Sequence, residues 1–345
     1  MEPNTDITSA RREYFFDIPL VSFMGLVDNR DRAVMNLCGN ALCYIILGMS
    51  FIVVTNNNIV GFLYFCGMYL FFFERFVLGL HFASHRRLSS FCIVNHVPQM
   101  LAPMFGIPWL MYRPHHLMIH HKHGNAHPGD ISSTEMYQRD NWVHLGFYCA
   151  RFLFMSALEV PCNMFVHGHS AVGFFAFLGF CTHVLVHYLL YSWNWTLFVW
   201  ALGLPALVSP ILLAMGNWSQ HIFIDQRDPT NPYCITYDIV NSRKNQETFN
   251  DGYHVQHHLF PRCHWSELPA TFEKQKERHV EEKGFIFTNT SFMHVGFLVV
   301  TKNYERLDQH LIYLADPLLT KSERQKLMRD RLRPVHRWKS GEVIQ

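Results

Sequence analysis

Nine histidines in this chain have a spacing that would place their imidazoles together on helix faces. Side chains three or four positions apart share one face of an α-helix. Imidazole nitrogen binds iron, zinc and copper, and nine ligands are too many for one metal ion and about right for two. The sequence therefore predicts a two-metal centre, with iron as the natural metal. The predicted ligands are His81, His85, His116, His120, His121, His221, His254, His257 and His258.

Other histidines compete with these positions. His115 precedes His116 and would be the ligand in a shifted register, but His116 is preferred because it gives the pattern H-x3-H-H. His183 and His187 form a further H-x3-H inside an apolar stretch, where a contact between helices is the preferred interpretation. His264 stays open as a residue that supports a ligand.

Composition points to a membrane protein. Of the 345 residues 49% are hydrophobic and 16% charged, whereas soluble domains carry about a quarter charged residues. The formal net charge of +2 gives no indication of nucleic-acid binding. The nine cysteines include no C-x2-C pair, so they predict buried reduced thiols and neither a disulfide framework nor a zinc site.

Four long apolar stretches predict membrane-crossing helices, since a crossing needs roughly 20 such residues. Very short links at 55–58 and 192–194 join them into two helical hairpins. The predicted fold class is an all-α integral membrane protein with four transmembrane helices and a cytosolic helical cap that carries the histidines. The predicted spans are residues 37–54, 59–80, 171–191 and 195–215.

The charge distribution predicts the topology. Basic residues gather at the ends opposite the hairpin tips, so the positive-inside rule places both termini and the long loops in the cytosol. All four histidine clusters then lie on one side, where a four-helix bundle would unite them. Residues 142–160 are apolar but contain His144, Arg151 and Glu159, which predicts an amphipathic helix in the interface. A crossing there would separate the second cluster from the third.

The same reasoning divides the chain into three parts. Residues 1–36 are predicted to be a cytosolic N-terminal segment, 37–269 the histidine-bearing domain, and 270–345 a cytosolic C-terminal region. The stretch 321–339 is basic, which favours contact with anionic membrane lipids. Asp251, just before the histidine cluster at 254–258, is expected to orient a ligand imidazole through the free N–H of the ring.

Two motifs carry a family resemblance. Residues 252–261 read GYHVQHHLFP, and residues 217–221 read NWSQH. The chain resembles the membrane fatty-acid desaturase and hydroxylase superfamily, which has three histidine boxes and a further histidine after the last span. The resemblance covers residues 37–269. It implies that Asn217 holds a metal-bound water, as the matching asparagine does in acyl-CoA desaturases.

The resemblance also implies the activity. A di-iron centre supplied with electrons by cytochrome b5 or a ferredoxin would use O2 to remove hydrogen from an unactivated C–H bond of an acyl lipid. A desaturase of the endoplasmic reticulum is therefore predicted. Hydroxylation or ketolation of a fatty acid, sphingoid base or carotenoid is the alternative. A non-catalytic metal-binding membrane protein is disfavoured, because a transporter places its ligands near the bilayer midplane.

The chain departs from relatives in two respects. Its third box begins with His254, where front-end desaturases usually have glutamine. Those enzymes often carry a fused cytochrome b5 domain, whereas this chain has only the short sequence HPGD at 127–130, interpreted as a chance likeness. The electron donor is therefore predicted to be a separate protein.

Overall fold

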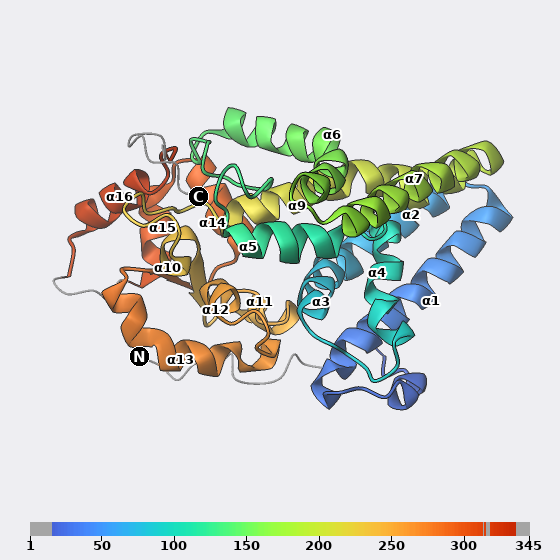
Figure 1. Ribbon diagram of the computed structural model, residues 1–345, viewed down its shortest axis with the longest axis horizontal. Helices are drawn as coiled ribbons and strands as arrows, with labels where there is room; N and C mark the ends of the chain where they lie inside the picture. Colours follow the sequence, from blue (N-terminus) through green and yellow to red (C-terminus); the bar gives the residue numbers. More distant parts are fainter. Residues whose placement is uncertain (1–15, 313, 315–317, 336–345) are drawn as a thin grey trace.

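The protein is described here by a computed structural model that covers residues 16–312, 314 and 318–335. Predictions for residues 1–15 and 336–345, including the end of the basic tail, lie outside the described residues. Long apolar helices occupy one side of the molecule, and short helices with a small sheet occupy the other (Figure 1).

The first two long helices form a hairpin. Helix α1 (Arg32–Thr55) ends at Asn56, whose left-handed backbone (φ 45°) turns the chain and whose N–H bonds to the carbonyl of Ile52. The Asn57 side chain then accepts a hydrogen bond from the Ile59 N–H, which caps the next helix. That second helix is one rod of 28 residues, Asn58–His85. It consists of α2 (Asn58–Gly67), the π-helical η5 (Met68–Phe73) and α3 (Glu74–His85).

Three more long helices follow. They are α6 (Trp142–Val166), α7 (Ser170–Trp193) and a rod made of α8 (Trp195–Phe198), the π-helical η9 (Val199–Gly203) and α9 (Leu204–Gln220). Helix α6 packs against α7 and α9. Helix α7 lies close to the backbone at Trp109, and this approach requires a glycine. A Cβ at Gly179 of α7 would overlap the carbonyl group of Trp109.

All four predicted spans lie within helices that are long and apolar enough to cross a membrane. Helix α6 meets the same criterion and is longer than the predicted 142–160 segment, so length and composition give five candidates where four were predicted. The charges on α6 are paired, because Arg151 and Glu159 lie 2.9 Å apart. Pairing lowers the cost of placing them in an apolar environment.

The cap corrects the all-α prediction, since it contains a three-stranded sheet. Strand β1 (Tyr237–Val240) runs parallel to β2 (Phe285–Thr288), and β3 (Leu311–Ile312) pairs antiparallel with β2. All of β1 and most of β2 are buried. Strands so short and buried on both faces lack the polar–apolar alternation that identifies a strand in a sequence.

Short helices fill the rest of the cap, so the predicted four-helix bundle is wrong. Helix α12 has six residues and packs on β1. The short elements up to the first long loop are η3 (Pro19–Phe23), η4 (Asn29–Asp31), η6 (Ile93–His96), α4 (Val97–Leu101), η7 (Ala102–Phe105), η8 (Pro114–His120) and α5 (His121–His123). Those of the C-terminal part are α10 (Pro232–Ile235), α11 (Arg243–Glu247), α12 (His254–Leu259), η10 (Trp265–Glu267), α13 (Leu268–Glu281), α14 (Phe292–Val300), α15 (Tyr304–His310) and α16 (Lys321–Asp330).

A buried arginine connects distant parts of the cap. The Arg139 guanidinium is fully buried and donates hydrogen bonds to six backbone carbonyls. One belongs to Ile222, just after α9, and two belong to Arg331 and Arg333, at the C-terminal end of the described chain. These bonds satisfy a charge that would otherwise be costly to bury. All nine cysteines are free, although only Cys38 and Cys234 are buried, so the predicted burial of the thiols is mostly wrong.

Candidate metal centre

Four segments bring the predicted ligands together. His81 and His85 lie on the last turns of α3, and His116 and His120 lie on η8 with His121 directly after it. His221 follows the last residue of α9. The third box forms α12, so that His254, His257 and His258 share one short helix. Because η8 is π-helical, its side chains are spaced differently around the helix axis than those of an α-helix. Such π-helical turns are common at functional sites.

Five of the histidines form a first group, within which one nitrogen of each ring lies within 4.8 Å of the others: His81, His85, His116, His121 and His257. The Nε2 atoms of His81 and His257 are 2.6 Å apart, and those of His121 and His257 are 3.0 Å apart. Two nitrogens bound at a right angle to one ion, each at about 2.1 Å, lie about 3.0 Å from each other. The spacing therefore fits imidazoles that share one metal ion.

A second group lies beside the first and contains His120, His221 and His258. His254 is not part of either group by this distance criterion, but its ring lies 4.9 Å from that of His258 and 5.4 Å from that of His221. The structure thus brings eight of the nine predicted ligands into two groups and places the ninth beside the second.

Unpaired ring nitrogens support a metal at the second group. The Nε2 atoms of His221, His254 and His258 are buried without a hydrogen-bond partner in the described part of the chain. Leaving a polar atom buried and unpaired costs about 1–3 kcal/mol, which a bond to a metal would remove. A donor set made of imidazole alone suits iron, copper or zinc. The residues present therefore fit a pair of transition-metal ions.

Burial keeps these rings neutral. It lowers the pKa of His116, His254, His257 and His258 well below 6.5, and the neighbouring imidazoles lower it further. Burial likewise lowers the pKa of His221, to about 3. A ring that is neutral at physiological pH has a lone pair free for a metal, which a protonated ring lacks.

A carboxylate that sequence reasoning missed orients one of these rings. Asp130 is fully buried, and its Oδ2 lies 2.8 Å from Nδ1 of His120. It also accepts hydrogen bonds from the backbone N–H groups of Asn125 and Ser132. With the proton on Nδ1, the Nε2 lone pair of His120 is free for a metal. Asp130 is the last residue of the HPGD sequence that was interpreted as a chance likeness. The only sequence signal for its role was its position ten residues after His120.

The backbone orients a second ring in the same way. Nδ1 of His221 lies 3.1 Å from the carbonyl oxygen of Ile235. That carbonyl belongs to α10, directly before the sheet. The contact could not be predicted from the sequence, because nothing in the sequence indicates that the two segments meet.

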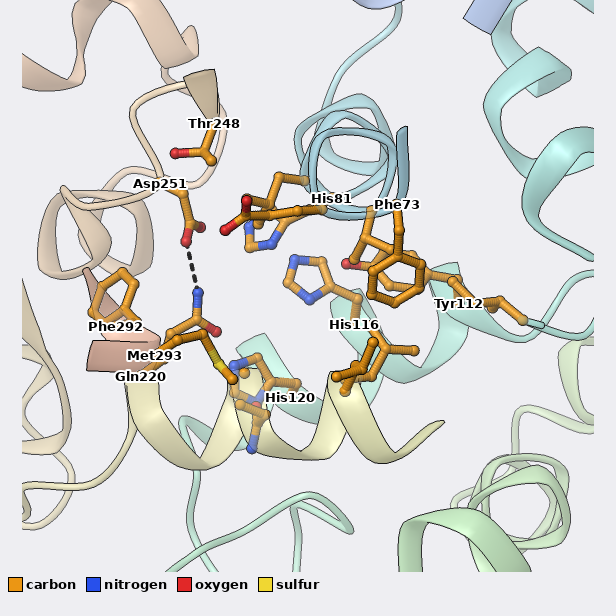
Figure 2. A pocket seen from close by; sticks show the side chains of 18 of the residues that line it. Phe73, His81, Tyr112, His116, His120, Gln220, Thr248, Asp251, Phe292 and Met293 are labelled. Carbon is orange, nitrogen blue, oxygen red and sulfur yellow. Dashed lines mark hydrogen bonds between the residues drawn. The ribbon is translucent and has the colours of Figure 1, made fainter. Parts of the chain in front are cut away.

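Asn217 and Asp251, which were expected to support the ligands, form hydrogen bonds with other protein groups. The Asn217 amide donates to the carbonyl of Ser132 and the hydroxyl of Tyr148, at 2.9 and 2.6 Å. One Asp251 oxygen is 3.7 Å from Nδ1 of His254, and the other accepts a hydrogen bond from Gln220 (Figure 2). Burial raises the pKa of Asp251 to about 7. The orienting role expected of Asp251 stays a prediction.

The competing histidines lie outside both groups. The ring of His115 packs against Phe152. Nδ1 of His187 bonds to the backbone carbonyl of His183 within α7, and the His187 ring packs against Phe198 of α8. Its Nε2 is buried without a hydrogen-bond partner in the described residues, so a purely structural role stays a prediction. His264 lies 3.3 Å from Asp31.

A cavity of about 410 Å³ opens onto the centre. His81, His116 and His120 lie on its wall (Figure 2). Gln220, Thr248 and Asp251 form a polar side, and Phe73 and Tyr112 lie across the cavity from it. The volume is within the usual range for sites that bind small organic ligands. The histidine groups therefore face a space that can hold a substrate.

Comparison with known families agrees with the geometry. Residues 57–288 match the family model described as fatty acid desaturase. This match covers more than half of the chain and includes every predicted ligand, so the chain belongs to the fatty acid desaturase family. No curated protein and no solved structure matched it.

Proposed function

We propose that this protein is an O2-dependent di-iron lipid desaturase that introduces a double bond into an acyl chain. Membership of the fatty acid desaturase family makes it an oxidoreductase that acts on lipids in a membrane context. The observation that carries the finer proposal is the pair of adjacent groups of buried imidazoles beside a largely apolar cavity. A cytochrome b5-type or ferredoxin-type protein would supply the electrons.

The chemistry explains this use of histidine. An unactivated C–H bond is beyond the reach of acid–base side chains, so bound iron and O2 would supply the oxidising power. The protein holds the metal ions and excludes water from the chain that reacts. His81, His85, His116, His121 and His257 would hold one ion, while His120, His221 and His258, with His254 beside them, would hold the other.

Hydroxylation is the second candidate, because it begins with the same hydrogen removal. The two outcomes differ only in what happens after that step. Desaturation removes two hydrogen atoms from the lipid, whereas hydroxylation adds one oxygen atom. The mass of the product therefore distinguishes them.

The test is lipid analysis of an iron-supplemented host that expresses the wild-type protein, the variant His257→Ala, or the control His96→Ala. His257 contacts both His81 and His121, whereas His96 is exposed and outside both groups. We expect a new unsaturated lipid with the wild type and the control, and a loss of at least 100-fold with His257→Ala. Undiminished product with His257→Ala would overturn the proposal. Purified wild-type protein without iron would instead favour a non-catalytic role.

We further propose four crossings, with α6 in the interface and both termini in the cytosol of an endoplasmic-reticulum membrane. The rings of His120 and His221 are 4.9 Å apart, so the chain between them must cross an even number of times. Helix α6, helix α7 and the rod that ends with α9 lie between those residues. They cannot all be full crossings, which supports the interfacial position for α6.

A further inference from the structure

One glycine in α9 is not explained by close packing against any described part of the chain. Glycine in a helix interior is less stable than alanine, so it usually marks a close approach. That explanation holds for Gly61, Gly67 and Gly179, where a Cβ would overlap Trp200, Tyr44 and Trp109. A Cβ at Gly216 would meet nothing within 4 Å.

The space next to Gly216 is the cavity described above. Gly216 is part of the cavity wall, together with Leu213, Asn217 and Gln220 from the same face of α9. His116 and His120 line the same cavity. The missing side chain therefore leaves open a part of the cavity that the two histidine groups face.

The cavity has a polar opening. Lys244 and Glu74 line it and form an ion pair of 2.9 Å, and each of these side chains is about half exposed. Because the pair reaches solvent, a polar headgroup can stay hydrated there. Two glutamates, Glu74 and Glu247, lie within 4 Å of the Lys244 ammonium and balance its charge.

Apart from the histidines and the polar side described above, a large part of the wall is apolar. Ile107, Met111 and Val160 line the cavity and are buried, with Met111 and Val160 in one apolar cluster beside α7. Burial of such a surface favours a hydrocarbon chain, at about 25 cal/mol per Å² of apolar area. The cavity thus fits one acyl chain whose polar group remains at the Lys244 opening.

We propose that Gly216 is a specificity-determining residue, which keeps the cavity wide enough for an acyl chain to reach the metal groups. This inference rests on the proposed lipid-oxidising function. A leucine side chain has four heavy atoms, and at position 216 they would extend into the cavity. They would displace several carbon atoms of a substrate.

The test compares Gly216→Ala and Gly216→Leu with the control Gly146→Leu. A Cβ at Gly146 also meets nothing within 4 Å, but this residue is exposed on α6 and does not line the cavity. All three changes increase helix propensity, so each variant should keep its iron content and its thermal stability. We expect product to fall at least tenfold in Gly216→Leu, to fall less in Gly216→Ala, and to stay at the wild-type level in the control.

A binding measurement makes the test independent of turnover. Stearate should displace a fluorescent polyene fatty acid from the wild type and the control, and the fluorescent lipid should bind at least tenfold more weakly to Gly216→Leu. Wild-type product and binding in Gly216→Leu would overturn the inference while leaving the proposed function intact. Loss of iron in Gly216→Leu would also overturn it, because the residue would then act through the metal site. A wild-type protein that binds the fatty acid but forms no product would instead contradict the proposed function.

Discussion

At the scale of residues, the chemistry depends on which ring nitrogen is free. The histidine positions were predictable, because their spacing repeats on helical faces and the third box matches a known family. The partners that hold the rings were less accessible. Asp130 lies only ten residues from His120 in the chain, yet the loop that turns it back onto Nδ1 has no periodicity to indicate this contact.

The contact with Asp130 predicts an effect on metal retention. In Asp130→Asn the side chain keeps its size but loses the negative charge that would make His120 a stronger metal ligand. Loss of such a partner typically lowers metal affinity by about 10- to 100-fold. We expect the purified variant to lose iron to a chelator correspondingly faster than the wild type.

Asp140→Asn is the matched control for that measurement. Asp140 is in the same loop, but its carboxylate accepts a hydrogen bond from the hydroxyl of Tyr304 and contacts no histidine in the described chain. Equal iron retention in the wild type and Asp130→Asn would show that Asp130 does not support the ligand.

At the scale of elements, the C-terminal helix docks through a buried ion pair. Asp225, after α9, lies 2.8 Å from Arg331, after α16, and both side chains are less than a tenth exposed. This pair could not be predicted from the sequence, since its two residues are more than a hundred positions apart. The short strands could not be predicted either, because they lack an alternating pattern. The long helices were predictable because 20 apolar residues in a row have few other stable arrangements.

This ion pair predicts a pH-dependent stability. Burial alone would raise the pKa of Asp225, but the hydrogen bond from Arg227 and the charge of Arg331 outweigh it and hold the pKa below its usual range. The carboxylate therefore stabilises the fold above its unfolded pKa of about 3.9, and this contribution is lost as the pH falls further. Asp225→Asn should lower the stability at pH 7 by about 3–5 kcal/mol.

Thermal unfolding of the purified protein across the pH range checks this effect. The difference in Tm between the wild type and Asp225→Asn should be full at pH 7 and shrink below pH ~4. Asp228→Asn serves as a control, because Asp228 is exposed and bonds to Thr230. A difference in Tm that is the same at pH 3 and pH 7 would refute the assigned role of the charge.

At the scale of the whole molecule, the number of crossings determines where the termini lie. Four crossings place both termini on the same side, whereas a fifth crossing by α6 would place them on opposite sides. We expect epitope tags at both ends to be digested when protease is added to sealed endoplasmic-reticulum vesicles with their cytosolic face outward. Protection of one tag only would mean an odd number of crossings. Detergent treatment, which opens the vesicles and should allow the protease to digest any protected tag, serves as the internal control.

The sequence by itself determined which histidines are candidate metal ligands and where the long helices lie, because histidine spacing and apolar length are local properties of the chain. Tertiary structure decided how eight of the nine histidines divide into two groups with His254 beside the second, and it brought Asp130 to the ring of His120 and the Ile235 carbonyl to that of His221. It also revealed the cavity over Gly216. These features depend on segments far apart in the chain or on loops without regular structure, and local patterns contain no information about which of them meet.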